Sequence, residues 1–273
     1  MMWNVVVKSV FLVLLLAYCI QLYFYNSTID PHIEGNISDE RFKLVYEVFR
    51  SNFIDGWERE GASLVVYQKG KKVVDIWGGY ADKESGRLWQ RDTLNIAFSC
   101  TKAVAGICIA KLVDQGLLNY DDPVEKHWPG FGKNGKENIT VRWLLGHRAG
   151  LAYTDHKIHL HIANDSKAIS RVFEEQRPNW PPGTEIGYHA LTFGWLVDQL
   201  IRRVDPKGRS IGVYFKQDIA DKYSIFSLLK FCDSCEYYSY IPSYVLVAEC
   251  ISNTLCIHPR TWLYGSPHCS KCA

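Results

Sequence analysis

Residues 93–102 read Thr93-Leu94-Asn95-Ile96-Ala97-Phe98-Ser99-Cys100-Thr101-Lys102, and an apolar run follows over residues 103–113. The first six residues are typical of a strand. The apolar spacing after Lys102 predicts a helix that ends at Gly116, since glycine is a usual residue at a helix C-terminus. Positions three apart share one face of a helix, so the amine of Lys102 should lie beside the hydroxyl of Ser99.

This serine–lysine pair has a chemical use. A serine hydroxyl becomes a nucleophile when a neighbouring base takes its proton, and a lysine whose pKa is lowered by its surroundings can be that base. The N–H groups and positive dipole end of the helix would stabilise an oxyanion forming at Ser99. A bare S-x-x-K also arises by chance, and a second copy runs from Ser227 to Lys230. The alternative for Ser99 alone is a helix-capping serine beside a solvated lysine.

Two later segments give the first copy its context. One reads Leu144-Leu145-Gly146-His147-Arg148-Ala149-Gly150-Leu151 and predicts a short helix that closes on a glycine-containing loop. The other reads Trp180-Pro181-Pro182-Gly183-Thr184-Glu185-Ile186-Gly187-Tyr188. A helix is predicted after it, with apolar residues at positions 193, 196, 200, 201 and 204.

In this order, the three segments resemble the serine beta-lactamase-like family of class C beta-lactamases, penicillin-binding DD-peptidases and related esterases. The resemblance spans about residues 39–221. Residues 99–102 are similar to the family's S-x-x-K motif, residues 144–151 to its L-L-x-H-x-[SA]-G-L segment, and residues 182–188 to its P-G-x-x-x-x-Y segment.

The resemblance implies a role for each matching residue. Ser99 would be the nucleophile that forms an acyl-enzyme, and Lys102 the base that activates it. Tyr188 would be a hydroxyl or phenolate that passes the proton to the leaving group, although an aromatic residue before a helix can also serve packing alone. His147 could act as a general base in another serine hydrolase, but the matching histidine of this family shapes a loop.

Two departures from the family pattern bear on activity. Beta-lactamases and peptidases of the family read Y-x-N, whereas this chain has Ala190 two residues after Tyr188. The missing asparagine amide favours esterase-like substrates over beta-lactams. No Lys-Thr-Gly, Lys-Ser-Gly or His-x-Gly follows residue 221, so the family's third motif, whose strand supplies an oxyanion-hole N–H, is absent from the sequence.

The resemblance implies an α+β fold of the beta-lactamase/transpeptidase type, in which an antiparallel sheet is covered by helices and a helical subdomain is present. Residues 61–67 and 72–77 predict a β-hairpin around residues 68–71. Ser38 is expected to cap a helix with apolar residues at positions 42, 45, 49 and 53. Because the third motif is absent, the family's C-terminal strands are expected to be missing.

The chain divides into four segments: 1–25, 26–37, 38–221 and 222–273. The last contains six of the nine cysteines and only seven charged residues, namely Lys222, Lys230, Asp233, Glu236, Glu249, Arg260 and Lys271. It is interpreted as the divergent end of a truncated product, with a disulfide-bonded module as one alternative. Another alternative is a zinc site from the pairs Cys232–Cys235 and Cys269–Cys272, which an oxidising lumen disfavours.

An apolar run over residues 9–25 follows Lys8. Aromatic residues at its end favour a signal anchor, with a cleaved signal peptide or a buried helix as alternatives. Residues 26–37 are expected to form a polar stalk. Four N-x-[ST] sequons favour a glycosylated lumenal or extracellular domain on a single-pass membrane protein, or else a secreted one; their asparagines are Asn26, Asn36, Asn138 and Asn164.

With 273 residues, of which 47% are hydrophobic, the chain is long enough for one large domain with a substantial core. The net charge of +2 favours neither nucleic acid nor a strongly acidic partner. No cofactor or metal is predicted, and the oligomeric state is left open. The expected function is that of a serine hydrolase acting on a small acyl ester or amide. The alternative is a catalytically inactive, membrane-tethered, truncated homologue.

Overall fold

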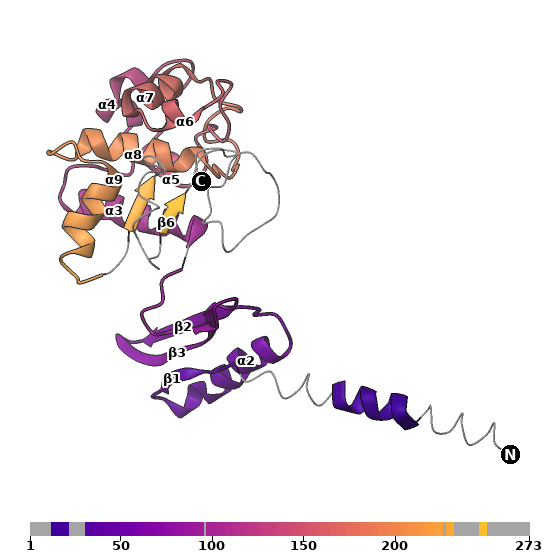
Figure 1. Cartoon of the computed structure of the whole chain (residues 1–273). Helices are drawn as coiled ribbons and strands as arrows, with labels where there is room; N and C mark the ends of the chain where they lie inside the picture. The colour runs from indigo at the N-terminus through magenta and orange to yellow at the C-terminus, as the bar shows by residue number, and fades with distance from the viewer. Residues whose placement is uncertain (1–11, 22–30, 96, 226–227, 232–245, 250–273) are drawn as a thin grey trace. The chain divides into compact units, whose positions relative to one another are not determined.

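In the computed structural model, residues 12–21, 31–95, 97–225, 228–231 and 246–249 are described, with side chains up to residue 225 (Figure 1). The chain forms two compact units, Met1–Thr93 and Leu94–Ala273. The first is built on a small antiparallel sheet, and the second is mainly helical.

The sheet of the N-terminal unit has the strand order β1-β3-β2, formed by β1 (Glu34–Ile37), β2 (Gly61–Gln68) and β3 (Lys71–Asp82), and β4 (Arg87–Leu88) also pairs with β3. All three pairings are antiparallel. Between β2 and β3 the chain turns through Lys69 and Gly70, whose φ angles are 49° and 74°. Two residues with positive φ fit the tight turn of a hairpin, so the predicted hairpin is confirmed.

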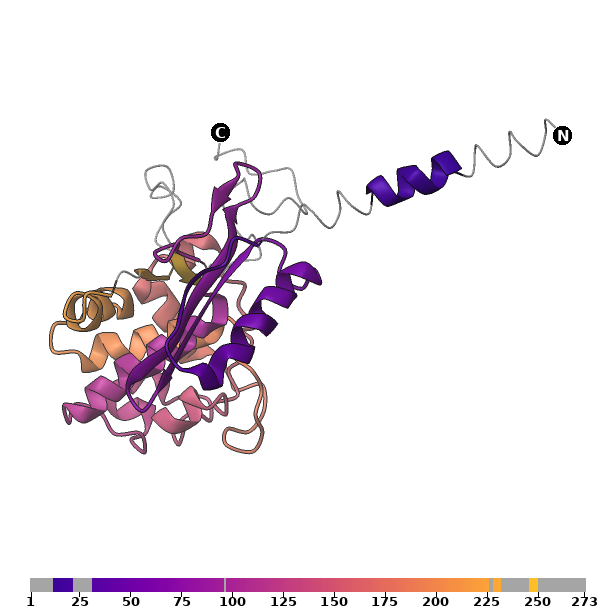
Figure 2. The same ribbon diagram turned by 90° about the horizontal axis from the view of Figure 1, so that it is seen from below.

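Helix α2 (Lys43–Ile54) lies along one face of this sheet (Figures 1 and 2). Its apolar side covers the strands because Phe49 and Phe53, one turn apart, pack against Val73, Val74 and Ile76. The predicted helix is therefore present, but its N-terminal cap was assigned to the wrong residue.

The cap belongs to a short 3-10 turn, η1 (Glu40–Phe42), that precedes α2. Asp39 is its N-cap, and the carboxylate of Asp39 accepts a hydrogen bond from the backbone N–H of Arg41 at 3.0 Å. The hydroxyl of Ser38 instead donates to the carbonyl of Lys72 at 3.0 Å. Ser38 therefore joins the entry of the helix to the sheet.

The N-terminal segment differs in part from its prediction. Residues 34–37, the end of the expected stalk, form β1, which pairs with Val74 to Trp77 of β3. Residues 12–21 are helical, whereas residues 1–11 and 22–30, with the rest of the expected anchor and the sequon at Asn26, lie outside the described residues. Within the described parts of the chain, no helix has both the length and the apolar character needed to span a membrane.

The second unit is built around helix α8 (Thr192–Val204), of which every residue except Arg202 and Arg203 is buried. The helices in contact with it are α3 (Thr101–Asp114), α4 (Val124–His127), α5 (Val141–Leu145), α7 (Ser166–Glu175) and α9 (Ile211–Phe215). Helix α6 (Leu160–Ala163) packs beside α7, η3 (Pro129–Phe131) follows α4, and a single π-helical turn, η4 (Lys216–Ala220), follows α9. Because nearly every side of α8 is buried, it forms the centre of the core.

The helix predicted after Lys102 is confirmed as α3, and Gly116 follows it with a φ of 69°. The strand predicted over residues 93–98 is wrong. Residues 93–95 and 97 have no regular structure, and Phe98 begins the 3-10 turn η2 (Phe98–Cys100). The apolar residues there enter the helical unit as an irregular segment instead of pairing with a sheet.

After residue 221, two short strands are present, β5 (Leu228–Phe231) and β6 (Leu246–Glu249). They pair in parallel with each other and form a sheet separate from β1–β4. Neither strand contains the third motif, and neither pairs with β1–β4, so these two strands are not the family's C-terminal strands that were expected to be missing. The cysteines proposed for zinc or disulfides, Cys232, Cys235, Cys269 and Cys272 among them, lie outside the described residues.

Candidate active site

Ser99 and Lys102 lie where the chain enters α3. Ser99 is in η2 and is exposed, and Lys102 is the second residue of α3. The ammonium nitrogen of Lys102 lies 3.4 Å from the hydroxyl oxygen of Ser99. Phe98, just before the serine, has a φ of 43°, which is rare for a residue with a large side chain. The backbone is therefore strained next to the hydroxyl, as is common where a side chain is aimed for function.

The segment around Tyr188 meets the same lysine. Lys102 Nζ donates a hydrogen bond of 2.9 Å to the carbonyl oxygen of Ala190. It also lies 5.0 Å from the centre of the Tyr188 ring and 5.7 Å from that of Phe193. Aromatic faces attract a cation, so these rings favour this position of the Lys102 nitrogen once it has taken up a proton. The structure thus brings Ser99, Lys102 and Tyr188 together, from positions 89 residues apart in the sequence.

His147 lies in the loop after α5 and contacts Tyr188. Its ring is 4.8 Å from the Tyr188 ring in an edge-on arrangement. Its Nδ1 accepts a hydrogen bond of 3.1 Å from the backbone N–H of His189, and its carbonyl accepts one of 3.0 Å from Gly187. Burial lowers the pKa of His147, and the neighbouring His189 and Lys102 lower it further. The expected loop-shaping contacts of this histidine are present.

The sequence did not single out His189, whose side chain is fully buried. Its Nδ1 lies 2.6 Å from the carbonyl oxygen of Gly187, and its Nε2 lies 2.9 Å from the backbone nitrogen of Leu151. Burial lowers its pKa. The residue joins the segment before α8 to the loop after α5. Its partner Leu151 is 38 residues away, so no local pattern signalled it.

The turn that leads to Tyr188 is shaped by two tryptophans. A side-chain carbon on Gly183, whose φ is 83°, would lie 2.6 Å from the ring of Trp143. One on Gly187 would lie 2.2 Å from the ring of Trp180. The guanidinium of Arg148 donates to the carbonyl of Gly183, and the N–H of Gly183 donates to the carbonyl of Arg148. Glycine is required at both positions because an indole ring takes the space of a side chain.

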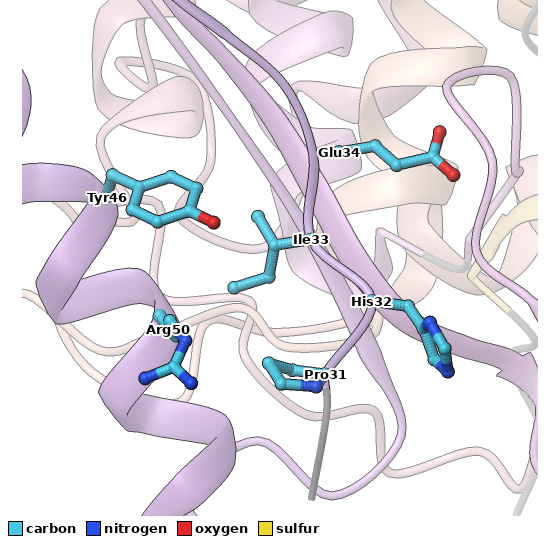
Figure 3. Close-up of a pocket in the computed structure, with 6 residues that line it drawn as sticks. All are labelled: Pro31, His32, Ile33, Glu34, Tyr46 and Arg50. Atoms are coloured by element: carbon cyan, nitrogen blue, oxygen red, sulfur yellow. The ribbon is translucent and has the colours of Figure 1, made fainter.

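The N-terminal unit contains a further hollow. An open pocket of about 250 Å³ lies in the N-terminal unit, where Tyr46 and Arg50 of α2 face residues 31–34 (Figure 3). It contains none of the three predicted catalytic residues. In the described part of the chain, no three His, Cys, Asp or Glu side chains are arranged to hold a metal ion.

The three sequon asparagines within the described residues, Asn36, Asn138 and Asn164, are all exposed. Asn36 lies in β1, Asn138 lies before α5, and Asn164 lies between α6 and α7. A glycan needs an accessible asparagine, so these positions are compatible with modification.

Comparison with known proteins gives a consistent set of relatives. The family model described as Beta-lactamase matches residues 49–225. The esterase/beta-lactamase LipL of Mycobacterium tuberculosis is 38% identical over 188 residues, which is 67% of this chain and 42% of that protein. The chain therefore spans less than half the length of this curated relative.

Two solved structures share the fold. A penicillin-binding protein homologue from Caulobacter crescentus is 38% identical with a TM-score of 0.67, and the match covers 74% of this chain and 53% of that one. A family VIII carboxylesterase is 36% identical with a TM-score of 0.64, covering 69% and 51%. The predicted beta-lactamase/transpeptidase-like α+β fold is confirmed by these matches. Because the family model matches well over half of the sequence, the chain belongs to the Beta-lactamase family.

Proposed function

We propose that this protein is a serine hydrolase that acts on an ester or amide through an acyl-enzyme at Ser99. The observation that carries the proposal is the 3.4 Å separation between the Lys102 amine and the Ser99 hydroxyl, at the start of a 14-residue helix. Family membership supports the same reaction class, since the matching proteins include an esterase/beta-lactamase and a carboxylesterase.

In the first step, the Ser99 oxygen attacks the carbonyl carbon and its proton passes to Lys102. The carbonyl π bond breaks to give a tetrahedral oxyanion beside the N-terminus of α3, whose dipole favours negative charge. The oxyanion collapses and the bond to the leaving group breaks, while Tyr188 gives its hydroxyl proton to that group and takes the proton held by Lys102. Water then attacks the acyl-enzyme in the same way, releasing the acid and restoring the Ser99 hydroxyl.

The preferred substrate class is an ester. Ala190 stands where beta-lactamases and peptidases of the family carry an asparagine, so its methyl group offers no amide to hold a substrate amide. The carbonyl of Ala190 accepts from Lys102 and so contributes to the site through its backbone. An ester also has a better leaving group than an amide, which reduces the demand on the proton transfer from Tyr188.

The rival proposal is a catalytically inactive, membrane-tethered homologue. It is favoured by the absence of a Lys-Thr-Gly or His-x-Gly segment from the sequence. In the resembling family, the strand with this segment supplies an oxyanion N–H, and loss of one such donor costs about 2.7–4 kcal/mol of transition-state stabilisation.

Labelling with a fluorophosphonate probe separates the two proposals. The active protein should be tagged covalently at Ser99, and the tag should be lost in Ser99→Ala. Ser63→Ala is the matched control, because Ser63 is an exposed serine with Val66, not lysine, three residues later. Its labelling should equal that of the wild type. If a protein shown to be folded by circular dichroism is not tagged, the hydrolase proposal is wrong and the rival stands.

We further propose that the N-terminal segment anchors the protein and places residues 31–225 on the lumenal or extracellular side. The apolar run over residues 9–25 and the exposed sequon asparagines support this location. After alkaline extraction, an anchored protein stays in the membrane pellet, whereas release into the supernatant contradicts the anchor. Digestion with an N-glycosidase should reduce the apparent mass, and an unchanged mass contradicts the lumenal location.

A further inference from the structure

His189 is a buried histidine whose two ring nitrogens have different backbone partners. Nδ1 faces a carbonyl oxygen, that of Gly187, so this nitrogen bears the proton and donates. Nε2 faces the N–H of Leu151, so this nitrogen is unprotonated and accepts. The surroundings therefore select one neutral tautomer of the ring.

His147 is held in the complementary tautomer. Its Nδ1 accepts the backbone N–H of His189, so the proton of the neutral ring is on Nε2. The two rings lie 5.5 Å apart, and burial lowers the pKa of both. The ionisable groups that face the pair are Lys102, which lowers the pKa of His147, and Tyr188, whose ring contacts the His147 ring. Both histidines are therefore neutral around pH 7.

These hydrogen bonds are made by the residues that come just before and just after Tyr188 in the chain. Gly187, just before it, donates to the His147 carbonyl and accepts from the His189 ring. His189, just after it, is bonded through its backbone to His147 and through its ring to Leu151. The next residue, Ala190, provides the carbonyl that accepts from Lys102. The backbone from Gly187 to Ala190 is therefore held to the loop after α5 and, through the Ala190 carbonyl, to Lys102 of α3.

We infer that His189 is a positioning residue of the hydrolase: through its single neutral tautomer, it fixes Tyr188 and the Ala190 carbonyl against Lys102. The inference rests on the proposed function, because it concerns the same site. His189 does not touch the reacting atoms, and its effect is transmitted by the backbone on either side of Tyr188. Proton transfer depends steeply on geometry, and a misplacement of about 1 Å can reduce a rate by about 100-fold.

The test uses the saturation kinetics of fluorophosphonate labelling on the full chain. His189→Phe keeps a buried ring but removes both hydrogen bonds, and we expect its maximal labelling rate to fall about 10- to 100-fold. The probe concentration for half-saturation should stay the same, since the binding surface is unchanged. His189→Asn retains a donor near the Nδ1 position, so it should recover part of the lost rate. If the two variants differed from the wild type only in stability, samples with equal folded fractions would be labelled at the same rate.

His127→Phe is the matched control, because it removes another largely buried histidine, one paired with Asp122 at 2.9 Å, from the same unit. Its labelling rate should equal that of the wild type. A double variant, Tyr188→Phe with His189→Asn, should be no slower than the slower single variant, because His189 acts through Tyr188. Equal rates for wild type and His189→Phe, or fully additive losses in the double variant, overturn the inference and leave the proposed function intact. An unlabelled wild type overturns both.

Discussion

The helices of the second unit begin in two different ways. Helices α5, α7 and α9 each start with a side chain that accepts a backbone N–H: Thr140, Asp165 and Ser210 respectively. Four helices, α3, α4, α6 and α8, have no such side chain at their N-caps, which are Cys100, Pro123, His159 and Leu191 respectively. The candidate site is built at two of these uncapped starts, since Ser99 and Lys102 lie at the start of α3 and Tyr188 lies just before α8.

A capped helix end is more stable, and its N–H groups are occupied. An uncapped end leaves N–H groups and dipole available for a developing negative charge. A side-chain cap therefore marks a helix start that serves the fold, and both helix starts at the candidate site lack one. Helix α7 is the clearest example of a helix whose ends serve the fold, because side chains bind backbone groups at both of its ends.

At the C-terminal end of α7, the closing group is Lys136, a lysine with no exposed surface. Its ammonium donates to the carbonyls of Glu174 at 3.0 Å and Gln176 at 2.6 Å, and to that of Lys133 at 2.8 Å. Burial lowers its pKa to about 8. This lysine is used for structure, whereas Lys102 at the start of α3 is the one proposed for chemistry.

The largest expected effect is on activity, at the uncapped start of α3. Lys102→Met removes the proposed base, and we expect the rate of fluorophosphonate labelling at Ser99 to fall by about 10²- to 10⁴-fold. The thermal midpoint should change little, because the lysine lies at a helix end near exposed residues. Lys102→Arg is the control for charge, and since arginine stays protonated it should not restore the rate. A labelling rate close to that of the wild type in either variant would contradict the assignment.

The second effect is on stability, at the closed end of α7. Lys136→Met leaves the carbonyls of Glu174 and Gln176 without their ammonium donor, and each unsatisfied buried group costs about 1–3 kcal/mol. We expect the free energy of unfolding to fall by about 3–5 kcal/mol in urea titrations. Lys133→Met is the matched control, because Lys133 is exposed and contributes only its backbone carbonyl. Equal stability of the two variants would show that Lys136 does not close the helix.

The third effect depends on pH and concerns the start of α8. The folded pKa values of His147 and His189 are lowered from 6.5, so the unfolded chain binds more protons below that value. Their contribution to stability is therefore complete above pH 6.5 and is lost as the pH falls through the folded values. Urea midpoints should decrease from about pH 7 to about pH 5. The decrease should be smaller in His189→Asn, and an equal decrease in both proteins would contradict this account.

A smaller loss of stability is expected at a helix that has a side-chain cap. Ser210→Ala removes the hydroxyl that accepts the backbone N–H of Val213 at the start of α9. We expect a loss of about 1 kcal/mol in the free energy of unfolding, with an unchanged labelling rate. Ser210→Asp, which keeps an acceptor at the N-cap, should retain most of the stability. A change in labelling rate without a change in stability would remove the distinction between the two groups of helices.

The smallest effect is expected at an uncapped helix. The buried hydroxyls of Thr101 in α3 and Thr192 in α8 have no hydrogen-bond partner among the described residues. Thr101→Val replaces an unsatisfied polar group with a methyl group of similar size, so stability should stay the same or rise by up to about 1 kcal/mol. Urea titration measures the change. A clear loss of stability would show that the hydroxyl is satisfied in solution, for example by a buried water.

Helix α3 and the β-hairpin could be predicted from the sequence, because each depends on residues that are close together in the chain. The apolar spacing and Gly116 defined α3, and the two-residue turn at Gly70 defined the hairpin. Strand β1 was assigned to a polar stalk, because Glu34, Gly35 and Asn36 lack the apolar alternation of a strand. It is a strand because β3 lies beside it, and pairing between distant segments leaves no local signal.

The candidate site likewise has residues that the sequence could name and one that it could not. Motif order and spacing named Ser99, Lys102 and Tyr188, and the structure places these three side by side. His189 could not be named, because its partners are backbone groups that only the folded chain brings near it. The strand predicted before Ser99 was wrong because apolar residues such as Leu94 and Phe98 fit an irregular entry into a helical core as well as a sheet.

The indole rings of Trp143 and Trp180 occupy the space that side chains at Gly183 and Gly187 would need. Each tryptophan and its glycine therefore constrain each other during evolution, although they lie 40 and 7 residues apart in the sequence. A larger residue at Gly187 is tolerated only after Trp180 has become smaller, and the reverse order passes through a clash. The turn before Tyr188 therefore depends on both members of each glycine–tryptophan pair.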